Sequence, residues 1–299
     1  DISNVSDTEL EAGLDLFNDA YGTGMVSCPE INDDGSTVIA ALIAHANTYN
    51  RVAVVHGESA NTAANMVTLA QTIQADPENL EHVGLYYPWL YAPTSIAGVN
   101  RLIPPDGYVA GIRARAHNGT GPQAPYAGLI SNAKFINGVA TEVDAATGDT
   151  LDAAAVNAIR VIAGGVRIYG ARSLSTDISN FRYITAQDIV NHVVTEGYRS
   201  LEDVVFMVIN GRNGAFASVE AKLQAVLEPL RVAGALYEAF DSDGKRIDYG
   251  YTVKCDASLN PVAQLAEGLV KARVGLRVSS VGDRIEVTIV KSNLTSSVV

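Results

Sequence analysis

The sequence predicts an α/β protein built on a parallel sheet, and three observations lead to this fold class. Helical patterns alternate with short, continuous apolar runs through the first half of the chain. Runs such as 51–55 and Val83–Tyr87 show almost no polar alternation, which is typical of strands buried on both faces of a parallel sheet. With 299 residues, of which 47% are hydrophobic and 18% charged, the chain can bury a core in one large or two moderate domains.

The first part of the chain reads as helices that separate short strands. Ser6 or Asp7 can cap a first helix that ends near Gly22, and Ser36 can cap a second helix. Further elements are predicted as strands at 25–28, 51–55 and 83–87 and a third helix at 60–73. Helices between short strands imply βαβ units, so we expect one α/β domain here.

The second part of the chain is more mixed. Turn signals occur at 137–138, 147–149 and 241–244. Periodicity predicts helices at 185–196, 211–230 and 258–273, strands at 166–169, 204–209, 246–255 and 284–290, and a helix followed by a strand within 152–162. The strand predicted at 284–290 alternates strictly between apolar and polar residues, with Ile285, Val287 and Ile289 on one face.

Charge and cysteine content exclude several classes of protein. The net charge of −12 comes from residues 1–100, which hold thirteen acidic residues and one base, Arg51, and such an acidic half argues against nucleic-acid binding. No apolar run is long enough to insert into a membrane. Cys28 and Cys255 lie far apart, so we expect buried free thiols and no metal pair. Because the chain begins at Asp1, we expect that an N-terminal part of the full protein is absent.

An irregular stretch at 85–126 contains the single tryptophan, Trp89, and six of the ten prolines. Pro88 ends the preceding strand because it has no N–H to donate to a ladder. Pro104 and Pro105 disfavour helix before them, and Asp106 can cap a helix at 107–116. The rings, fixed φ angles and glycines of this stretch predict a rigid corner and not a catalytic loop.

This corner and two later blocks resemble the tail sheath protein of contractile-tailed phages and related contractile injection particles. The first block contains Tyr87-Pro88-Trp89, PPDGYVAG at 104–111, Ala114-Arg115 and Ala124-Pro125. The second is GGVRIYGARSLS at 164–175, where the family usually has tryptophan in place of Tyr169 and threonine in place of Ser173. The third is Phe181-Arg182-Tyr183-Ile184. Three weak motifs in the family's order make the resemblance specific.

The resemblance implies a structural protein and not an enzyme. It implies a parallel-sheet, subtilisin-like α/β domain without a catalytic triad at 1–176, followed by an α+β sheath C-terminal domain at 177–299 that carries a terminal arm. Such subunits polymerise helically around a tail tube and contract to drive it through a cell envelope, and no nucleotide, cofactor or metal is needed. The implied partners are further copies of the chain, the tail tube protein, and baseplate and tail-terminator proteins. The implied location is a virion tail assembled in the host cytoplasm.

The resemblance also suggests two assembly sites. A helix of the C-terminal domain faces the tube in sheath proteins, so Lys271 and Arg273 near the end of the 258–273 helix are tube-facing candidates; favourable placement at a helix C-terminus is the simpler interpretation. Terminal arms add strands to sheets of neighbouring subunits, which makes Ile285, Val287 and Ile289 candidates for an inter-subunit arm.

The rival hypothesis is an α/β hydrolase-like enzyme that uses His56 as base and Ser59 as nucleophile, because both follow a predicted strand. The G-x-S-x-G elbow is missing, however. The His56-x-Glu58 spacing would also fit a zinc deaminase, but the required P-C-x-x-C is missing. The 241–244 turn lacks the glutamate of a calcium loop, and there is no phosphate-binding G-x-x-x-x-G-K-[ST] motif.

Four arginines lie within the matched blocks, and two uses are open to them. They could bind an anion, but arginines of this kind more often fix one segment to another through carboxylates and carbonyl groups. They are Arg113, Arg115, Arg167 and Arg172.

Overall fold

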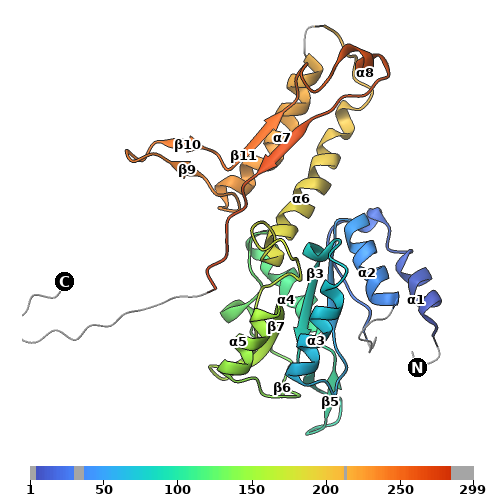
Figure 1. Cartoon of the computed structure of the whole chain (residues 1–299), viewed down its shortest axis with the longest axis vertical. Coiled ribbons are helices and arrows are strands. Elements are labelled where there is room, and N and C mark those ends of the chain that lie inside the picture. The colour runs from blue at the N-terminus through green and yellow to red at the C-terminus, as the bar shows by residue number, and fades with distance from the viewer. Residues whose placement is uncertain (1–4, 30–36, 212–213, 284–299) are drawn as a thin grey trace, which may run out of the picture.

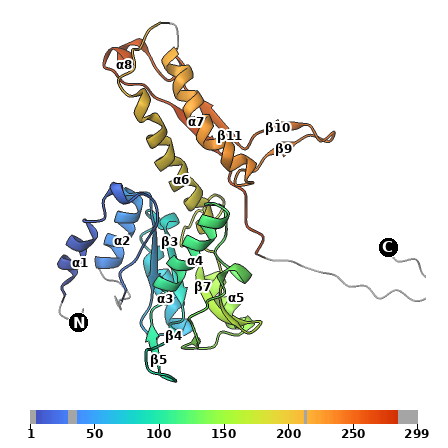
Figure 2. The same cartoon turned by 180° about the vertical axis from the view of Figure 1, so that it is seen from behind.

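The computed structural model describes residues 5–29, 37–211 and 214–283. These form two parts (Figures 1 and 2): an α/β lobe from α1 to β8, and an arm that begins with α6 and extends away from the lobe. The arm rises from one end of the lobe, and the chain after its last strand descends again toward the lobe.

A five-stranded sheet forms the centre of the lobe, in the order β1-β2-β3-β7-β8. The first four of these strands are parallel and β8 is antiparallel to β7, which confirms the predicted α/β class with a mostly parallel sheet. Every residue of β2 and β3 is buried, as expected for strands covered on both faces. Their bounds are β1 Met25–Val26, β2 Val52–His56, β3 Val83–Tyr87, β7 Val156–Ile162 and β8 Gly165–Tyr169.

Helices cover both faces of this sheet and bury two separate cores. One core contains Met66 and Leu69 of α3 with Leu151 of α5, and the other contains Val109 and Ile112 of α4. Helix α1 packs on α2 at the outside, and its predicted cap is confirmed because Ser6 and Glu9 form a capping box. The helices are α1 Asp7–Leu14, α2 Thr37–Thr48, α3 Ala63–Gln74, α4 Asp106–Gly119 and α5 Ala145–Ala153, with one-turn 3₁₀ helices η2 Asp19–Tyr21, η3 Leu80–His82 and η4 Gly128–Ser131.

The predicted corner connects the large sheet to a small one. The Tyr87–Pro88 peptide bond is cis, and the Trp89 indole donates a 2.8 Å hydrogen bond to the Gly57 carbonyl. The expected cap is wrong by one residue, because Pro105 takes the cap position and Asp106 is the first helical residue. The small sheet has the order β5-β4-β6, with β4 Leu90–Pro93, β5 Asn100–Ile103 and β6 Gly138–Val139.

The outer edge of β8 is sealed by side chains. The Ser131 hydroxyl accepts a hydrogen bond from the Ile168 N–H at 3.0 Å and lies 3.2 Å from the Ile168 carbonyl oxygen. The Tyr108 hydroxyl donates to the carbonyl groups of Ser131 and Val166. These bonds take the place of a further strand at two residues, because the Ile168 N–H and the Val166 carbonyl both have side-chain partners at this edge.

The arm has its own small core between two long helices and a β-hairpin. Ile189 and Val193 of α6 pack with Leu227 and Leu230 of α7. The hairpin of β11 Tyr251–Lys254 and β12 Arg273–Leu276 covers them. A second, two-stranded hairpin projects from the arm (Figure 1). The elements are α6 Ile184–Leu201, η5 Glu202–Val204, α7 Gly214–Val232, β9 Ala239–Phe240 paired with β10 Arg246–Asp248, α8 Val262–Ala266, and β11 Tyr251–Lys254 paired with β12 Arg273–Leu276.

Three predicted elements of the arm are wrong. The apolar run at 204–209 is not a strand: Val204 ends the one-turn helix η5, a turn follows at 205–206, and Phe206 has a positive φ of 66° that a strand does not allow. The predicted strand at 246–255 is divided into β10 and β11, because Gly250 turns the chain with a φ of 77°. The predicted helix at 258–273 shrinks to the five residues of α8, because Gly268 ends it at a φ of 80° and Arg273 begins β12.

In the lobe, the turn predicted at 147–149 is instead part of α5, which ends before Ala155 turns the chain into β7 at a φ of 60°. The predicted cap at Ser36 and the predicted strand at 284–290, with Ile285, Val287 and Ile289, lie outside the described residues.

Candidate functional site

The two residues of the hydrolase hypothesis do not form a catalytic pair. His56 is buried at the end of β2, with Nδ1 2.9 Å from the Gly57 carbonyl oxygen and its ring edge-on to Trp89. Its Nε2 atom lies 4.0 Å from a carboxylate oxygen of Asp106, which is also buried. Ser59 is exposed in the following turn, and no hydrogen bond joins it to His56 among the described residues. A general base must reach the proton it removes, so this arrangement supplies no activated serine.

The described residues also contain no group of histidine, cysteine and acidic side chains that could hold a metal ion. Cys28 and Cys255 are free thiols in the structure, and burial raises the pKa of both. Within the described part of the chain, no helix is both long and apolar enough to cross a membrane.

A buried polar joint holds the first helix of the arm against the lobe. Arg113 of α4 donates two hydrogen bonds to one carboxylate oxygen of Asp188 in α6, at 3.0 and 2.5 Å. Gln187, directly before Asp188, contacts His82, and Asn191 on the next turn of α6 donates to the Arg51 carbonyl. Three positions of one helix thus bond to three segments of the lobe, which fixes the orientation of α6.

Burial shapes the charges of this joint. Although burial opposes the charge of Arg113, the Asp188 carboxylate raises the pKa of that guanidinium above its usual value. Burial lowers the pKa of His117 to about 4, an effect that Asp188 opposes and that Arg113 and His192 reinforce. His117 Nε2 is 3.6 Å from the second carboxylate oxygen of Asp188, so the joint carries one charged pair and a neutral imidazole at neutral pH.

The structure shows how three of the four block arginines are used. Arg113 bonds to Asp188, Arg115 donates to the carbonyl groups of Ile130 and Asn132, and Arg172 donates a bidentate pair to Asp152 at 2.8 and 2.6 Å. These contacts fix segments to one another, which confirms that interpretation. Arg167 is different, because its buried Nε has no hydrogen-bond partner among the described residues.

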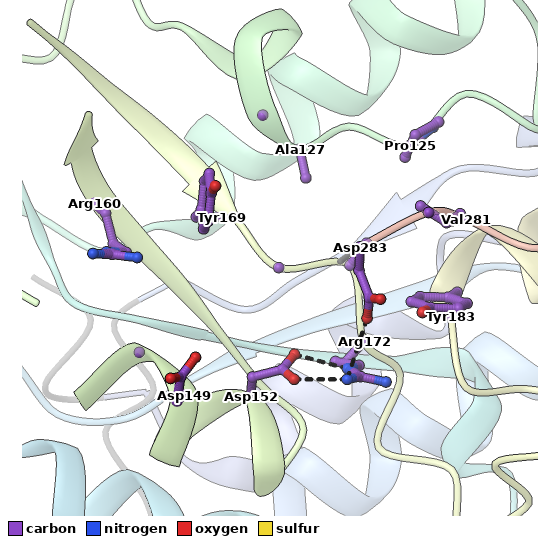
Figure 3. Close-up of a pocket in the computed structure, with 15 residues that line it drawn as sticks. Pro125, Ala127, Asp149, Asp152, Arg160, Tyr169, Arg172, Tyr183, Val281 and Asp283 are labelled. Atoms are coloured by element: carbon purple, nitrogen blue, oxygen red, sulfur yellow. Dashed lines mark hydrogen bonds and ion pairs between the residues drawn. The ribbon is translucent and has the colours of Figure 1, made fainter. Parts of the chain in front are cut away.

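A cavity of about 520 Å³ lies where the C-terminal segment meets the lobe (Figure 3). Residues of α5, the end of β8 and the segment 281–283 line it, and its charged residues are Asp149, Asp152, Arg160, Arg172 and Asp283. Hydrogen bonding to Asp152 raises the pKa of Arg172, with Asp152 and Asp283 adding their negative charge. Sequence reasoning missed Asp283 altogether and gave no role to Arg182 and Tyr183, although both stand in a block that it singled out.

The tube-facing candidates lie at the hairpin of the arm and not on a helix. Lys271 is exposed, and its backbone exchanges two hydrogen bonds with the Asn260 side chain. Arg273 is exposed at the start of β12, opposite Lys254 in β11. Within the described residues neither Lys271 nor Arg273 forms an ion pair, so their charges face solvent.

The arm also exposes an unusual number of large apolar side chains. Two groups stand out: Phe206 with its neighbours Val205 and Val208 after α6, and four residues on and beside the β9–β10 hairpin. The second group is Tyr237, Phe240, Ile247 and Tyr249, each more than half exposed. Grouped apolar surface of this kind is typical of contact surfaces.

The lobe and arm together have the fold of the sheath proteins of contractile particles. The chain aligns with a chain of the contracted sheath complex of PVC, an extracellular contractile injection system, at a TM-score of 0.74 and 21% identity, over 96% of this chain and 75% of the other. A chain of the baseplate of the anti-feeding prophage gives a TM-score of 0.73 and 17% identity, over 96% and 74%. The sheath tail protein of Desulfitobacterium hafniense gives 0.56 and 13%, over 83% and 52%.

The chain matches no protein-family model and no curated protein. At 12–21% identity the likeness of the solved structures defines the fold.

Proposed function

We propose that the chain is a structural subunit of a contractile sheath, which polymerises helically around a tube and shortens to drive the tube through a cell envelope. One observation carries this proposal: 96% of the chain aligns at a TM-score of 0.74 with a contracted sheath complex, arm and lobe together. The exposed apolar surface of the arm supports it, because an open helical assembly needs contact surfaces that do not close on a partner. No enzyme activity is proposed, since His56 and Ser59 lack catalytic geometry.

The proposed division of the chain places a subtilisin-like α/β domain without a triad at 1–176 and a sheath C-terminal domain at 177–299. The separate cores of the lobe and the arm support this division, because the arm core draws on α6, α7 and the β11–β12 hairpin. The start of α6 is the exception, since Ile184 packs in a core of the lobe. The proposed location is a contractile particle, either a virion tail or an extracellular system such as that of PVC.

The proposed contact with the tube uses Lys271 and Arg273. Their side chains are solvent-exposed cations without ion-pair partners among the described residues, so they are free to meet acidic groups of a tube protein. Exposed charges at the edge of an interface affect binding to the partner more than they affect the stability of the fold. The variant Lys271→Glu/Arg273→Glu should bind tubes more weakly and keep its melting temperature. Equal decoration of tubes by the parent and this variant, seen by electron microscopy, would remove the contact from the proposal.

The proposed links between copies use residues 284–299 as a strand-donating arm, with Ile285, Val287 and Ile289 as its apolar face. The two-stranded sheets β9–β10 and β11–β12 support this, because each has edges that no third strand covers among the described residues. Main-chain pairing would let links persist while subunits rotate. Baseplate and terminator proteins are proposed as partners at the two ends of the sheath.

The test is electron microscopy of the full-length protein expressed with its tube protein. Helical sheaths around the tube are expected, and deletion of residues 284–299 should abolish them without unfolding the lobe. His56→Ala and Ser59→Ala should assemble like the parent. A full-length protein that sediments only as a small discrete species, with or without tubes, would refute the proposed function.

A further inference from the structure

The segment that follows β12 connects the arm to the lobe at two places. On the arm, Val278 forms a β-bridge with Leu236, and the Ser279 N–H donates to the Ala235 carbonyl at 2.9 Å. The segment then runs along the cavity beside the end of β8, where Figure 3 shows Val281 and Asp283 facing Arg172 and Tyr183. Asp283 is therefore the last described residue that anchors the chain before residues 284–299.

Asp283 meets three side chains of the lobe. One carboxylate oxygen lies 3.3 Å from a guanidinium nitrogen of Arg172 and 3.8 Å from one of Arg182. The Tyr183 side chain lines the same cavity as Asp283. The Tyr183 ring lies 5.4 Å from the guanidinium carbon of Arg172 and 5.7 Å from that of Arg182, so it holds the two cations side by side.

The charges of the side chains around Asp283 balance only when one carboxylate is present. Arg172 is already neutralised by its bidentate partner Asp152, and Asp149 and Arg160 offset one another along the cavity wall. Arg182 forms no ion pair with any other described residue, so without Asp283 the site carries one excess positive charge. Two guanidinium groups that approach one carboxylate oxygen match the charge of a single carboxylate.

We propose that Arg172, Arg182 and Tyr183 form a carboxylate-binding site on the lobe, and that Asp283 occupies it as a latch that fixes where the C-terminal segment leaves the lobe. The site gives a role to Arg182 and Tyr183 in the third sequence block. Its consequence rests on the proposed function: if residues 284–299 link subunits, the latch sets the starting point of the link. Release of residues 280–283 would lengthen the reach of that link by up to roughly 14 Å, at about 3.5 Å per extended residue.

The contact can be trapped chemically in the isolated chain. Arg182→Lys keeps the positive charge and allows a carbodiimide to join its amine to a carboxylate in direct contact. Mass spectrometry is expected to find residue 182 linked to residue 283, and Asp283→Asn should remove the link. A mixture of ¹⁵N-labelled and unlabelled chains reports whether the link forms within one chain. Linkage of residue 182 to other carboxylates only, or linkage only between labelled and unlabelled chains, would overturn the latch.

The strength of the latch can be measured by proteolysis. Trypsin cleavage after Arg277 requires release of a segment that is bonded to the arm, and Asp283→Asn or Arg182→Gln should speed it by about 5- to 30-fold, the factor expected when one charge-assisted contact is lost. Asp283→Glu should restore slow cleavage, and the exposed control Asp243→Asn should leave it unchanged. Unchanged cleavage in both latch variants would refute the proposal. Both measurements use the isolated chain, so a failure of the full-length protein to form sheaths would contradict the proposed function and leave the latch standing.

Discussion

The ion pair between Arg113 and Asp188 joins helix α6 of the arm to the lobe, and its burial determines how much unfolding free energy is lost when the pair is broken. The Asp188 carboxylate has no exposed area, the Arg113 side chain is 11% exposed, and two hydrogen bonds of 3.0 and 2.5 Å join them. Asp188→Leu would leave the guanidinium buried without a counter-charge. Removing one partner of such a pair costs about 3–5 kcal/mol of unfolding free energy.

The double variant Arg113→Met/Asp188→Leu separates this effect from a simple loss of attraction. It removes both charges and replaces them with apolar side chains, an exchange that is often neutral or stabilising. We therefore expect the double variant to recover most of the stability lost by Asp188→Leu alone.

Thermal unfolding followed by circular dichroism measures the difference. A change of 1 kcal/mol shifts the melting temperature by about 2–4 °C in chains of 150–250 residues, so Asp188→Leu should lower it by roughly 6–10 °C in this longer chain. Lys222→Met, which removes an exposed ion pair with Asp203, is the matched control and should shift it little. If Asp188→Leu and the double variant are equally destabilised, the joint depends on shape and not on charge, and the reasoning fails.

Three further outcomes are expected. Because the pKa of His117 is lowered from 6.5 to about 4, the folded chain binds fewer protons than the unfolded chain between these pH values. The free energy of unfolding, measured with urea, should therefore fall as pH drops from about 6.5 toward 4, and His117→Gln should flatten this fall. Gly250→Ala should cost more stability than Gly234→Ala in the same assay, because both have a φ of 77° but only at Gly250 would a Cβ meet a backbone oxygen, at 2.8 Å; equal costs would contradict the contact. Leu151→Ala should lower the free energy of unfolding by about 2–5 kcal/mol, because Leu151 is fully buried between α5 and the sheet.

Most of the lobe could be predicted from the sequence because local signals agree with burial there. The runs that became β2 and β3 are almost wholly apolar, as expected for strands covered on both faces of a parallel sheet. The cap of the first helix was predicted at Ser6 or Asp7, and Ser6 takes it by forming a capping box with Glu9. Such features need no knowledge of distant contacts.

The arm was harder to predict because tertiary contacts override local pattern. The apolar residues at 204–209 suggested a strand, but they have no strand beside them and lie exposed in a turn. The periodic residues at 258–273 suggested a helix, yet Asn260 bonds to the backbone of Lys271 and closes the segment into a loop. The site around Asp283 brings it to residues that lie at least one hundred positions earlier in the chain, namely Arg172, Arg182 and Tyr183. In the sequence, only their place in the matched blocks singled these residues out.

The sealed edge of β8 restricts how copies of this chain can join through their backbones. Ser131 bonds to the Ile168 N–H and Tyr108 to the Val166 carbonyl, two of the groups that a visiting strand would need, and the opposite edge of the sheet ends in the two-residue strand β1. A strand from another chain would therefore have to displace the Ser131 and Tyr108 side chains before it could pair with β8. An added strand is left with the short β1 edge and with the small sheets, of which β5-β4-β6 lies in the lobe and the other two lie in the arm, so strand pairing from outside would occur at the periphery of the molecule and not beside β8.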